Sequence, residues 1–464
     1  MLEPIGRDAV VVEFAGAHAG TAPLTWGQKA IYQDMCESGN QFNMGGRMEL
    51  PPGTTIGDAA ARLRRLILRH AALRMRLRTD GAGRPGQEIA GSGEIGLDIL
   101  TIPDEADEVQ VASYAADLMD TWPRARSDFE RDWPLRMAVI KQADSPLYLV
   151  WVLSHLATDG GGHILMLEDL MADESAGREV GDPRHPDVLD LAADEQEPHL
   201  RQLSKRTMRH WESALKDIPA QTFAESAGPG GRPPGEAPRY WQARFRSPAT
   251  HLAVLGIAAR TGTDLSRATI AIIATAIGRV TGASRLTIKV MVNNRFRPGL
   301  ADVIAPIAQN SVLTIDFAGA TVDEVVTRTK NGTLTAGMRA YYDPDDLREL
   351  TARLDADRGY RAAVTCRIND QRAMIMRSDS ETKTGEVSGE MISRALGETT
   401  LTWLGRRDNM HEQVNILIEN RPGVVSLHMM WDRWCLSDGQ VEAILRGVEE
   451  VAVEAAFDPA VSGI

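Results

Sequence analysis

The sequence predicts an α/β protein whose strands and helices form mixed sheets in two lobes. The chain has 464 residues, roughly three times the ~150 residues of a typical domain, so more than one lobe is expected. Strand-like and helix-like segments follow one another without strict alternation, which favours mixed sheets. An acidic, proline-containing stretch at Ala172–Glu197 separates the two halves. We therefore expect an N-terminal lobe over residues 1–180 and a C-terminal lobe over residues 181–464.

The composition is that of an acidic globular protein. Hydrophobic residues make up 43% and charged residues 25% of the chain, which excludes a long disordered or collagen-like protein. Asp and Glu (64) outnumber Lys and Arg (51), and the net charge of −13 disfavours nucleic acid and anionic membranes as partners. The three cysteines, Cys36, Cys366 and Cys435, lack zinc or haem spacing and exclude a disulfide framework. We predict no metal site.

The N-terminus and the apolar runs bear on where the protein is located. The opening MLEPIGRDAVVVEFAG has no basic region followed by an apolar one, so it does not resemble a signal peptide. The longest apolar runs, such as Leu147–Leu153, are far shorter than the roughly 18 residues that cross a bilayer. We therefore expect a cytoplasmic protein with no membrane partner. We also expect a monomer.

Apolar spacing and capping residues predict the elements of the first lobe. Thr25 precedes one helical pattern, and Thr55 or Asp58 precedes a second that ends near His70. Short β-branched runs predict the strands. Apart from the helix that Thr55 or Asp58 precedes, the predicted elements are, in order, a strand at Ala9–Phe14, the helix after Thr25 from Trp26 through Met35, a strand at Ala72–Leu77, a hairpin turn at Asp80–Gly86, a helix at Glu105–Thr121, paired strands at Leu135–Ile140 and Leu147–Leu153, and an apolar helix from about His163 to Met171.

The second lobe shows the same mixture. Helices are predicted at Arg201–Ile218, Pro248–Thr261, Asp264–Val280, Val322–Gly337, Asp345–Arg353 and Ser437–Ala456. Strands are predicted at Tyr240–Arg246, Leu286–Asn293, Val312–Phe317, Ala362–Ile368, Leu401–Trp403, Gln413–Asn420 and Val424–Trp431. Glu225–Pro238 is rich in Gly and Pro and is expected to be a loop. The polar stretch Arg377–Thr400 is either a long crossover between the lobes or an ordinary loop.

The residues best suited to chemistry lie where an apolar strand ends. Trp151–Gly162 reads WVLSHLATDGGG, so His155 closes the strand and Asp159 follows four residues later, before three glycines. We expect the glycines to let the loop turn sharply, with the N–H groups of Gly160 and Gly161 facing the site. A neutral imidazole at His155 could take a proton from an attacking amine or hydroxyl. On these residues alone, a structural role for the histidine stays open.

The flanking sequence points to a known family. SHLATDGG resembles the HHxxxDG motif of the condensation domains of nonribosomal peptide synthetases, which chloramphenicol-acetyltransferase-like acyltransferases share. Other segments resemble elements of that family in the expected order and extend over nearly the whole chain. They are LTWGQKAIY (Leu24–Tyr32), LRRLILRHAALRMRLR (Leu63–Arg78), FERDWPLRMAVIK (Phe129–Lys141), MRHWESALKDIP (Met208–Pro219), the Leu286–Phe317 segment and LHMMWDRWCLSDGQVEAIL (Leu427–Leu445).

The resemblance implies a fold and a reaction. The fold would be two chloramphenicol-acetyltransferase-like lobes in a V shape, with an active-site tunnel between them and crossover segments from the C-terminal lobe. The reaction would be condensation in natural-product biosynthesis, such as that of antibiotics. An acyl or aminoacyl thioester on a carrier protein would react with an amine or alcohol and form an amide or ester. The phosphopantetheine arm belongs to the acyl or peptidyl carrier protein, so we expect no cofactor of the chain's own.

The resemblance also implies roles for four residues. His155 matches the second histidine of the motif, which acts as a base or positions the proton of the nucleophile. Gly160 matches the motif glycine and could offer its N–H to a developing oxyanion, although a simple turn glycine is equally compatible. Asp159 is implied to be structural and to pair with an arginine of the other lobe, which is Arg295 in VNNRFR. Apart from the resemblance, His163 on the following helix is expected to be structural.

Two departures from the family pattern affect this reading. Ser154 stands in place of the first histidine, and Ala305–Ala308 replaces a glycine-centred sequence. We expect Ser154 to hold the loop by hydrogen bonding and not to be a nucleophile, because no G-x-S-x-G elbow surrounds it. No adenylation, carrier or thioesterase sequence is attached, so we expect a free-standing enzyme or a degenerate relative. The alternative is a catalytically silent domain that recruits a carrier protein or partner enzyme.

Overall fold

Strands and helices are mixed along the chain, and they form two units. The computed structural model describes residues 2–16, 18–172, 186–219, 223, 240–360, 364–372, 387–407, 410 and 412–464. One unit contains Met1–Arg201 and Arg295–Ala308, and the other contains Gln202–Asn294 and Gln309–Ile464. The first unit thus extends past the boundary expected after residue 180, which itself falls among the undescribed residues 173–185. The segment 295–308 is a part of the first unit that the second half of the chain contributes.

The first unit is built on a five-stranded sheet and a smaller three-stranded one. The larger sheet has the order β1-β6-β7-β8-β3, in which only β6 and β7 run parallel, and the smaller has the order β2-β5-β4. The elements are β1 (Gly6–Ala15), β2 (Gly20–Pro23), α1 (Trp26–Ser38), β3 (Asn43–Glu49), α2 (Ile56–Arg69), β4 (Met75–Thr79), β5 (Pro85–Ile89), β6 (Ser92–Ile102), α3 (Glu108–Thr121), β7 (Leu135–Gln142), β8 (Ser145–Ser154), α4 (Gly160–Met171) and α5 (Val188–Asp194).

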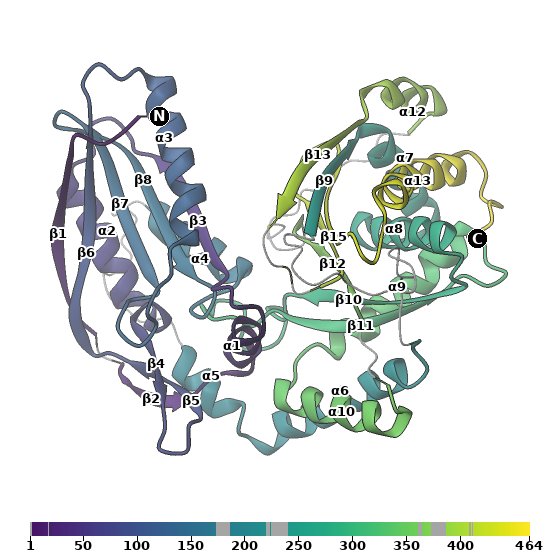
Figure 1. Ribbon diagram of the computed structural model, residues 1–464, viewed down its shortest axis with the longest axis horizontal. Helices are drawn as coiled ribbons and strands as arrows, with labels where there is room; N and C mark the ends of the chain where they lie inside the picture. The colour runs from purple at the N-terminus through teal and green to yellow at the C-terminus, as the bar shows by residue number, and fades with distance from the viewer. Residues whose placement is uncertain are drawn as a thin grey trace. The chain divides into compact units, whose positions relative to one another are not determined.

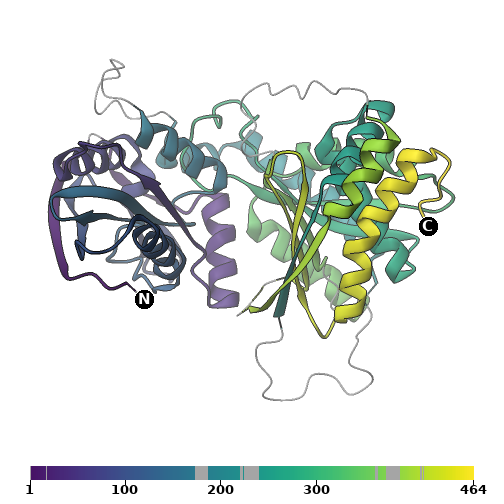
Figure 2. The ribbon, with the colours of Figure 1, turned by 90° about the horizontal axis from the view of Figure 1, so that it is seen from above.

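The second unit is built on a seven-stranded mixed sheet. Its order is β11-β10-β12-β14-β15-β9-β13, and β12 runs parallel to both of its neighbours. The elements are α6 (Pro198–Leu215), which begins just before the boundary, β9 (Tyr240–Ser247), α7 (Pro248–Thr261), α8 (Leu265–Thr281), β10 (Arg285–Val292), β11 (Gln309–Asp316), α9 (Val322–Met338), α10 (Pro344–Arg358), β12 (Cys366–Asp370), α12 (Gly389–Ala395), β13 (Thr400–Arg407), β14 (Val414–Glu419), β15 (Val425–Asp432) and α13 (Asp438–Phe457). Figures 1 and 2 show α7, α8 and α13 gathered beside this sheet.

Side-chain caps define several helices as the sequence predicts. Thr25 is the N-cap of α1, where its side chain and that of Gln28 form a capping box. For α2 the two candidate caps act together, because Thr55 is the N-cap and Asp58 completes its capping box. The core between sheet and helices then buries the apolar positions, among them Trp431 on β15, which is fully buried.

Several elements differ from those that the sequence pattern predicts, or lack the pattern of a strand. The strand expected at Ala72–Leu77 begins instead as a 3-10 turn, Ala71–Arg74, and only then becomes β4. β3 contains two glycines and polar residues, and it is a strand because it pairs along its length with β8. The expected loop Glu225–Pro238 and residues 377–386 of the expected crossover lie outside the described residues.

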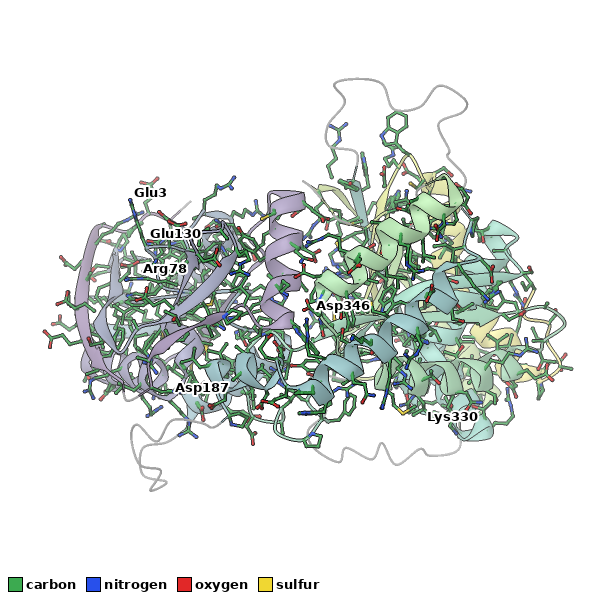
Figure 3. All side chains as sticks on the ribbon, turned by 90° about the horizontal axis from the view of Figure 1, so that it is seen from below. Glu3, Arg78, Glu130, Asp187, Lys330 and Asp346 are labelled. Carbon is green, nitrogen blue, oxygen red and sulfur yellow. The ribbon has the colours of Figure 1, made fainter. Side chains whose placement is uncertain are left out.

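Charged side chains lie on the outside of the sheets. On β4, Arg78 pairs with Glu88 of β5 at 2.6 Å and donates to the carbonyl oxygen of Glu130 at 2.7 Å (Figure 3). Such exposed pairs are worth little free energy of folding, and their main effect here is to keep the hairpin polar. In the residues that the structure describes, no helix is both long and apolar enough to cross a membrane.

Candidate functional site

The motif segment lies between a buried strand and a helix. β8 has β7 on one side and β3 on the other, which explains the apolar sequence before Ser154. Ser154 is 2% exposed. Its N–H donates to the carbonyl of Pro134 at 2.8 Å, and its own carbonyl accepts from Ala157 at 3.0 Å. Its Oγ accepts from the N–H of Leu156 at 3.2 Å. Ser154 therefore closes the tight turn that carries His155.

His155 lies in that turn and is half-buried. Its ring atom Nδ1 is buried, and in the described part of the chain no group makes a hydrogen bond to it. Buried polar side-chain atoms nearly always have a partner, and an exception calls for a functional or structural reason. The indole N–H groups of Trp211 and Trp431 are likewise buried without a partner among the described residues, so the unpaired Nδ1 alone does not distinguish a functional histidine from a structural one. Because Nδ1 is closed to solvent, proton exchange with a bound molecule would use the other ring nitrogen, Nε2.

Asp159 follows the turn, where its side chain is 2% exposed and joins three segments. Its carboxylate accepts from Gly162 N–H at 2.8 Å, which makes Asp159 the N-cap of α4. It lies 2.7 Å from Nη1 of Arg295, and it accepts from the N–H groups of Ile307 at 2.9 Å and Ala308 at 2.8 Å. Burial by itself would raise the pKa of Asp159, but Arg295 and these hydrogen bonds hold that pKa below its ordinary value.

Arg295 fixes the returning segment around this carboxylate. Its Nη2 donates to the carbonyl oxygens of Val303 at 3.0 Å and Ala305 at 3.2 Å. The resemblance implied an arginine from the other lobe, whereas the structure places Arg295 in the first unit, with residues 295–308. The change of unit occurs directly after Asn294, which has a left-handed φ of 55° and donates to the carbonyl of Ala340 at 2.9 Å in the second unit. Asparagine is one of the few residues that adopt this conformation readily.

The departure at Ala305–Ala308 has a simple consequence in the structure. Asp159 contacts that segment through the backbone N–H groups of Ile307 and Ala308, so the side chains there are not the contacting groups. The neighbouring Pro306 packs against α1, because a Cβ added to Gly27 would lie 1.7 Å from the Pro306 carbonyl oxygen. Sequence reasoning did not identify Gly27, although a glycine in the first turn of a helix was the available signal.

The glycines after Asp159 belong to the first turn of α4, which corrects the expected loop. A Cβ on Gly161 would lie 2.6 Å from Arg295 Nη1, and one on Gly162 would lie 2.1 Å from Thr158 Oγ1. These glycines therefore make room for the guanidinium and do not serve a sharp turn. Gly160 is the first residue of α4 and is half-buried. The N–H groups of a helical first turn have no partner within the helix, so Gly160 retains a donor at the positive end of α4.

His163 has the structural surroundings expected of it. Its Nε2 accepts from Trp151 Nε1 at 2.9 Å, and the two rings meet edge to face. Burial lowers the pKa of His163 to about 4, so this imidazole is neutral near pH 7. The Trp151 ring in turn requires a glycine on β3, because a Cβ on Gly46 would lie 2.1 Å from it.

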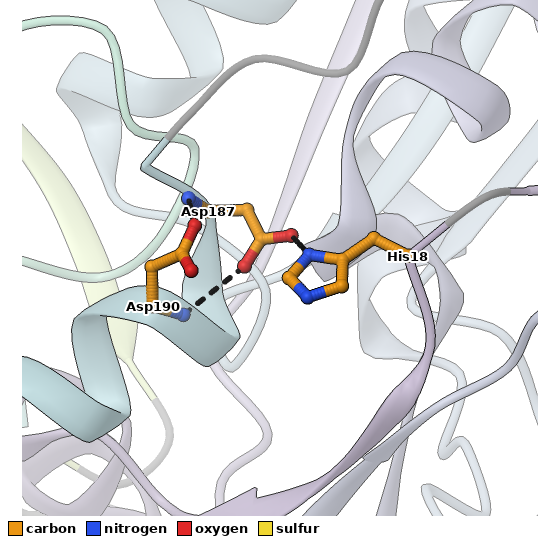
Figure 4. Close-up of side chains that lie close together, drawn as sticks. All are labelled: His18, Asp187 and Asp190. Carbon is orange, nitrogen blue, oxygen red and sulfur yellow. Dashed lines mark hydrogen bonds and ion pairs between the residues drawn. The ribbon is translucent and has the colours of Figure 1, made fainter.

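A separate cluster in the first unit brings together three side chains of metal-ligand type. His18, Asp187 and Asp190 place one potential ligand atom each within 4.8 Å of the others (Figure 4). Asp187 pairs with Nδ1 of His18, and its other oxygen accepts from the N–H groups of Leu189 at 2.8 Å and Asp190 at 3.2 Å. Asp190 completes this capping box by accepting from the Asp187 N–H. The cluster is thus a capped helix start at α5 joined to a histidine.

The second unit contains a cavity of about 240 Å³ along the edge of β11. His210 and Ser213 of α6, Thr314 of β11 and Thr335 of α9 are among its lining residues. None of the residues singled out from the motif lines this cavity, so it does not enlarge the candidate site around His155.

A known protein family and a known sequence are similar to this chain. The family model of the condensation domain matches residues 18–392. A probable nonribosomal peptide synthetase of Salinispora arenicola, CymA, is 26% identical over 282 residues, and the match covers 58% of this chain but 4% of that relative. Any activity of that whole synthetase thus concerns far more chain than is matched here.

Three solved structures have a similar fold. One comes from a study of chain release by a condensation domain of the enacyloxin polyketide synthase (TM-score 0.69, 17% identity, 96% of this chain and 84% of that one). Another is SgcC5 of Streptomyces globisporus (0.69, 17%, 95% and 100%). A third is the X-domain of teicoplanin biosynthesis in complex with OxyB (0.67, 17%, 97% and 96%). Because the family model covers most of the chain and the mixed α/β fold agrees, this chain belongs to the condensation-domain family.

Proposed function

We propose that this chain catalyses condensation between a carrier-protein thioester and an amine or alcohol. The family supports acyl transfer in natural-product biosynthesis as the reaction class. The observation in the site that carries the proposal is the state of His155. His155 is half-buried at the end of β8, in a turn that Ser154 closes and Asp159 anchors, and Nε2 is the ring nitrogen left for a substrate because Nδ1 is closed to solvent. A rigid support for one titratable group is what proton transfer requires.

The proposed reaction balances without an added reagent. The nitrogen or oxygen of the acceptor attacks the thioester carbonyl carbon. A C–N or C–O bond forms, and the C–S bond breaks as the phosphopantetheine thiol leaves on the carrier protein. His155 takes or positions the proton that the acceptor loses, and the leaving sulfur receives that proton in turn. The phosphopantetheine arm arrives with the acyl or peptidyl carrier protein, so the chain itself supplies proton transfer and positioning.

Gly160 is proposed to stabilise charge during this step. Attack on the carbonyl places negative charge on its oxygen, and a fixed N–H donor lowers the barrier most when that charge develops. The N–H of Gly160 is at the N-terminus of α4, whose dipole favours a negative group. Asp159 and Arg295 hold that N-terminus in place and are not proposed to touch the substrate.

The direct test is intact-protein mass spectrometry of loaded carrier proteins. Carrier proteins charged with acyl- or aminoacyl-phosphopantetheine are incubated with the chain and a panel of amines and alcohols. The expected result is loss of the acyl mass from the carrier and its appearance on an acceptor, at a rate that His155→Ala reduces. Reactions without acceptor control for hydrolysis. Transfer that proceeds equally with His155→Ala, or no transfer from any carrier, counts against the proposal.

A second function is favoured by Ser154. Replacement of the first motif histidine fits a catalytically silent domain that recruits a carrier protein or a partner enzyme. The solved X-domain, which has a similar fold, is in complex with OxyB. The same assay separates the two functions, because a silent domain would bind a charged carrier protein without unloading it, and His155→Ala would not change that binding.

A further inference from the structure

The outer edge of the five-stranded sheet is open. β1 is the first strand in the sheet order and pairs with β6 on one side, while none of the described strands pairs with its other side (Figure 1). The strand has ten residues, GRDAVVVEFA, without a proline. An exposed edge of this length is a template for pairing with another strand, and proteins commonly protect such edges by proline, bulges, charged side chains or short length.

The pairing with β6 shows which backbone groups of β1 face outward. The N–H of Gly16 donates to the carbonyl of Gly91, in the register that also aligns Ala15 with Ser92. Because alternate residues of an antiparallel pair exchange hydrogen bonds, the even-numbered residues of β1 bond to β6 and the odd-numbered residues direct their N–H and C=O groups away from it. The carbonyl of Glu13 also faces outward, where it accepts from Arg64 of α2 at 3.2 Å, so one lone pair of that oxygen remains for a second strand.

The centre of this edge is apolar and exposed. Val11 is 60% and Val10 is 36% exposed, whereas Val12 and Phe14 are buried against the core of the unit. Arg7 and Glu13 are exposed near the two ends of the strand, and Asp8, which is also exposed, points to the opposite face from them. When two copies of such a strand run antiparallel, the apolar centres can face each other. Arg7 and Glu13 can then each face the oppositely charged residue of the other copy.

We propose that two copies of this chain pair through β1, antiparallel, about a two-fold axis at Val10. The outward backbone groups require odd-numbered residues to face odd-numbered residues. An axis at Val10 meets this requirement and places Ala9 opposite Val11 of the second copy and Arg7 opposite its Glu13. An axis at Ala9 or at Val11 also meets it, but each charge would then face an apolar residue. The Val10 register is therefore the one that joins opposite charges at both ends.

This pairing is weak and reversible. Each cross-strand pair contributes roughly 0.2–1 kcal/mol, and one strand edge buries less surface than stable interfaces do. The dimer therefore forms as protein concentration rises, and added salt weakens it by screening the two charge pairs. It departs from the expectation of a monomer. The inference is independent of the proposed function, because β1 contributes no residue to the site around His155.

Sedimentation equilibrium of the full chain tests the inference. The average mass is expected to rise from the 50.7 kDa of one chain towards twice that value with concentration. Arg7→Glu or Glu13→Arg alone places like charges opposite each other and should keep the protein monomeric. Mixing the two single variants restores opposite charges at both pairs, so the mixture should form a heterodimer, and the double variant should dimerise again.

The controls make each outcome informative. Both substitutions are at exposed positions, and recovery in the mixture shows that each variant is folded. Wild-type protein that stays monomeric at every concentration would overturn the proposal. Single variants that dimerise as well as wild type would show that copies associate through another surface, and a mixture that stays monomeric would rule out the Val10 register.

Discussion

Asp159 and Arg295 are 136 residues apart in the sequence, yet their side chains meet at 2.7 Å inside one unit. The carboxylate also caps α4 and binds the backbone of the returning segment. This ion pair therefore connects α4, the helix after the motif, to the segment 295–308, which is far along the chain but belongs to the same unit. This connection lies four residues after His155 in the chain.

Asp159→Ala should lower the free energy of unfolding by about 3–5 kcal/mol, because removal of one partner leaves a buried guanidinium without its counter-charge. The matched control is Glu442→Ala, since Glu442 and Arg446 form an exposed pair at 2.8 Å. That change should have an effect within about 1 kcal/mol. Urea unfolding of both variants measures the difference. Similar losses in the two would mean that the buried pair has no special structural role.

Gly161→Ala should also destabilise the protein. The added Cβ would lie 2.6 Å from Arg295 Nη1, and overpacking of this kind lowers stability by about 1–3 kcal/mol. Gly256→Ala on α7 is the control, because nothing lies within 4 Å of the added Cβ there. That substitution should stabilise the helix by about 0.5–1 kcal/mol. Thermal melts of the two variants should therefore shift in opposite directions, and a shift in the same direction would contradict the role given to Gly161.

His155→Ala should reduce turnover by roughly 10²-fold or more, because it removes the proposed proton acceptor. Nδ1 has no hydrogen bond to lose in the described part of the chain, so the change in melting temperature reports mainly the lost packing of the half-buried ring. Single-turnover transfer from a charged carrier protein, together with the melting temperature, gives both values. His155→Gln distinguishes the two forms of the role: full loss of activity indicates a base, and partial activity without a pH dependence indicates positioning of the nucleophile.

Ser154→Ala should have a modest effect. The hydroxyl accepts one hydrogen bond, from Leu156 N–H, so its loss should lower stability by roughly 0.5–1.5 kcal/mol and leave the chemistry intact. Mass spectrometry of the wild-type protein after incubation with a charged carrier should show no acyl adduct on Ser154. A mapped adduct, or a folded but inactive Ser154→Ala protein, would identify Ser154 as a nucleophile instead.

His163 should make stability depend on pH. Its folded pKa of about 4 lies below its ordinary 6.5, so the unfolded chain takes up the proton first as pH falls. The stabilisation is complete above pH 6.5 and is lost progressively between pH 6.5 and about 4. At pH 5 the loss in free energy of unfolding is about 2 kcal/mol. His163→Gln retains an acceptor for Trp151 without a titrating group. Urea unfolding at pH 7 and pH 5 should show a larger loss for wild type than for this variant.

Much of the candidate site could be predicted from local patterns. The apolar run before Ser154 predicted the strand, and a serine or threonine before an apolar repeat predicted the caps of α1 and α2. The role of the glycines does not follow from local patterns. A run of glycine after Asp159 indicated a loop, because sequence spacing does not reveal that a guanidinium occupies the space beside the helix.

The sequence by itself determined the mixed α/β class, the order of most elements and the motif with His155 and Asp159, because these depend on periodicity and capping over a few residues. Only the tertiary structure decided that residues 295–308 belong to the first unit, that Asp159 binds backbone N–H groups at Ile307 and Ala308, and that β1 is an open edge. These features depend on contacts between residues far apart in the chain. Local sequence patterns contain no information about such long-range contacts. The order of strands in a sheet is decided by how they pack.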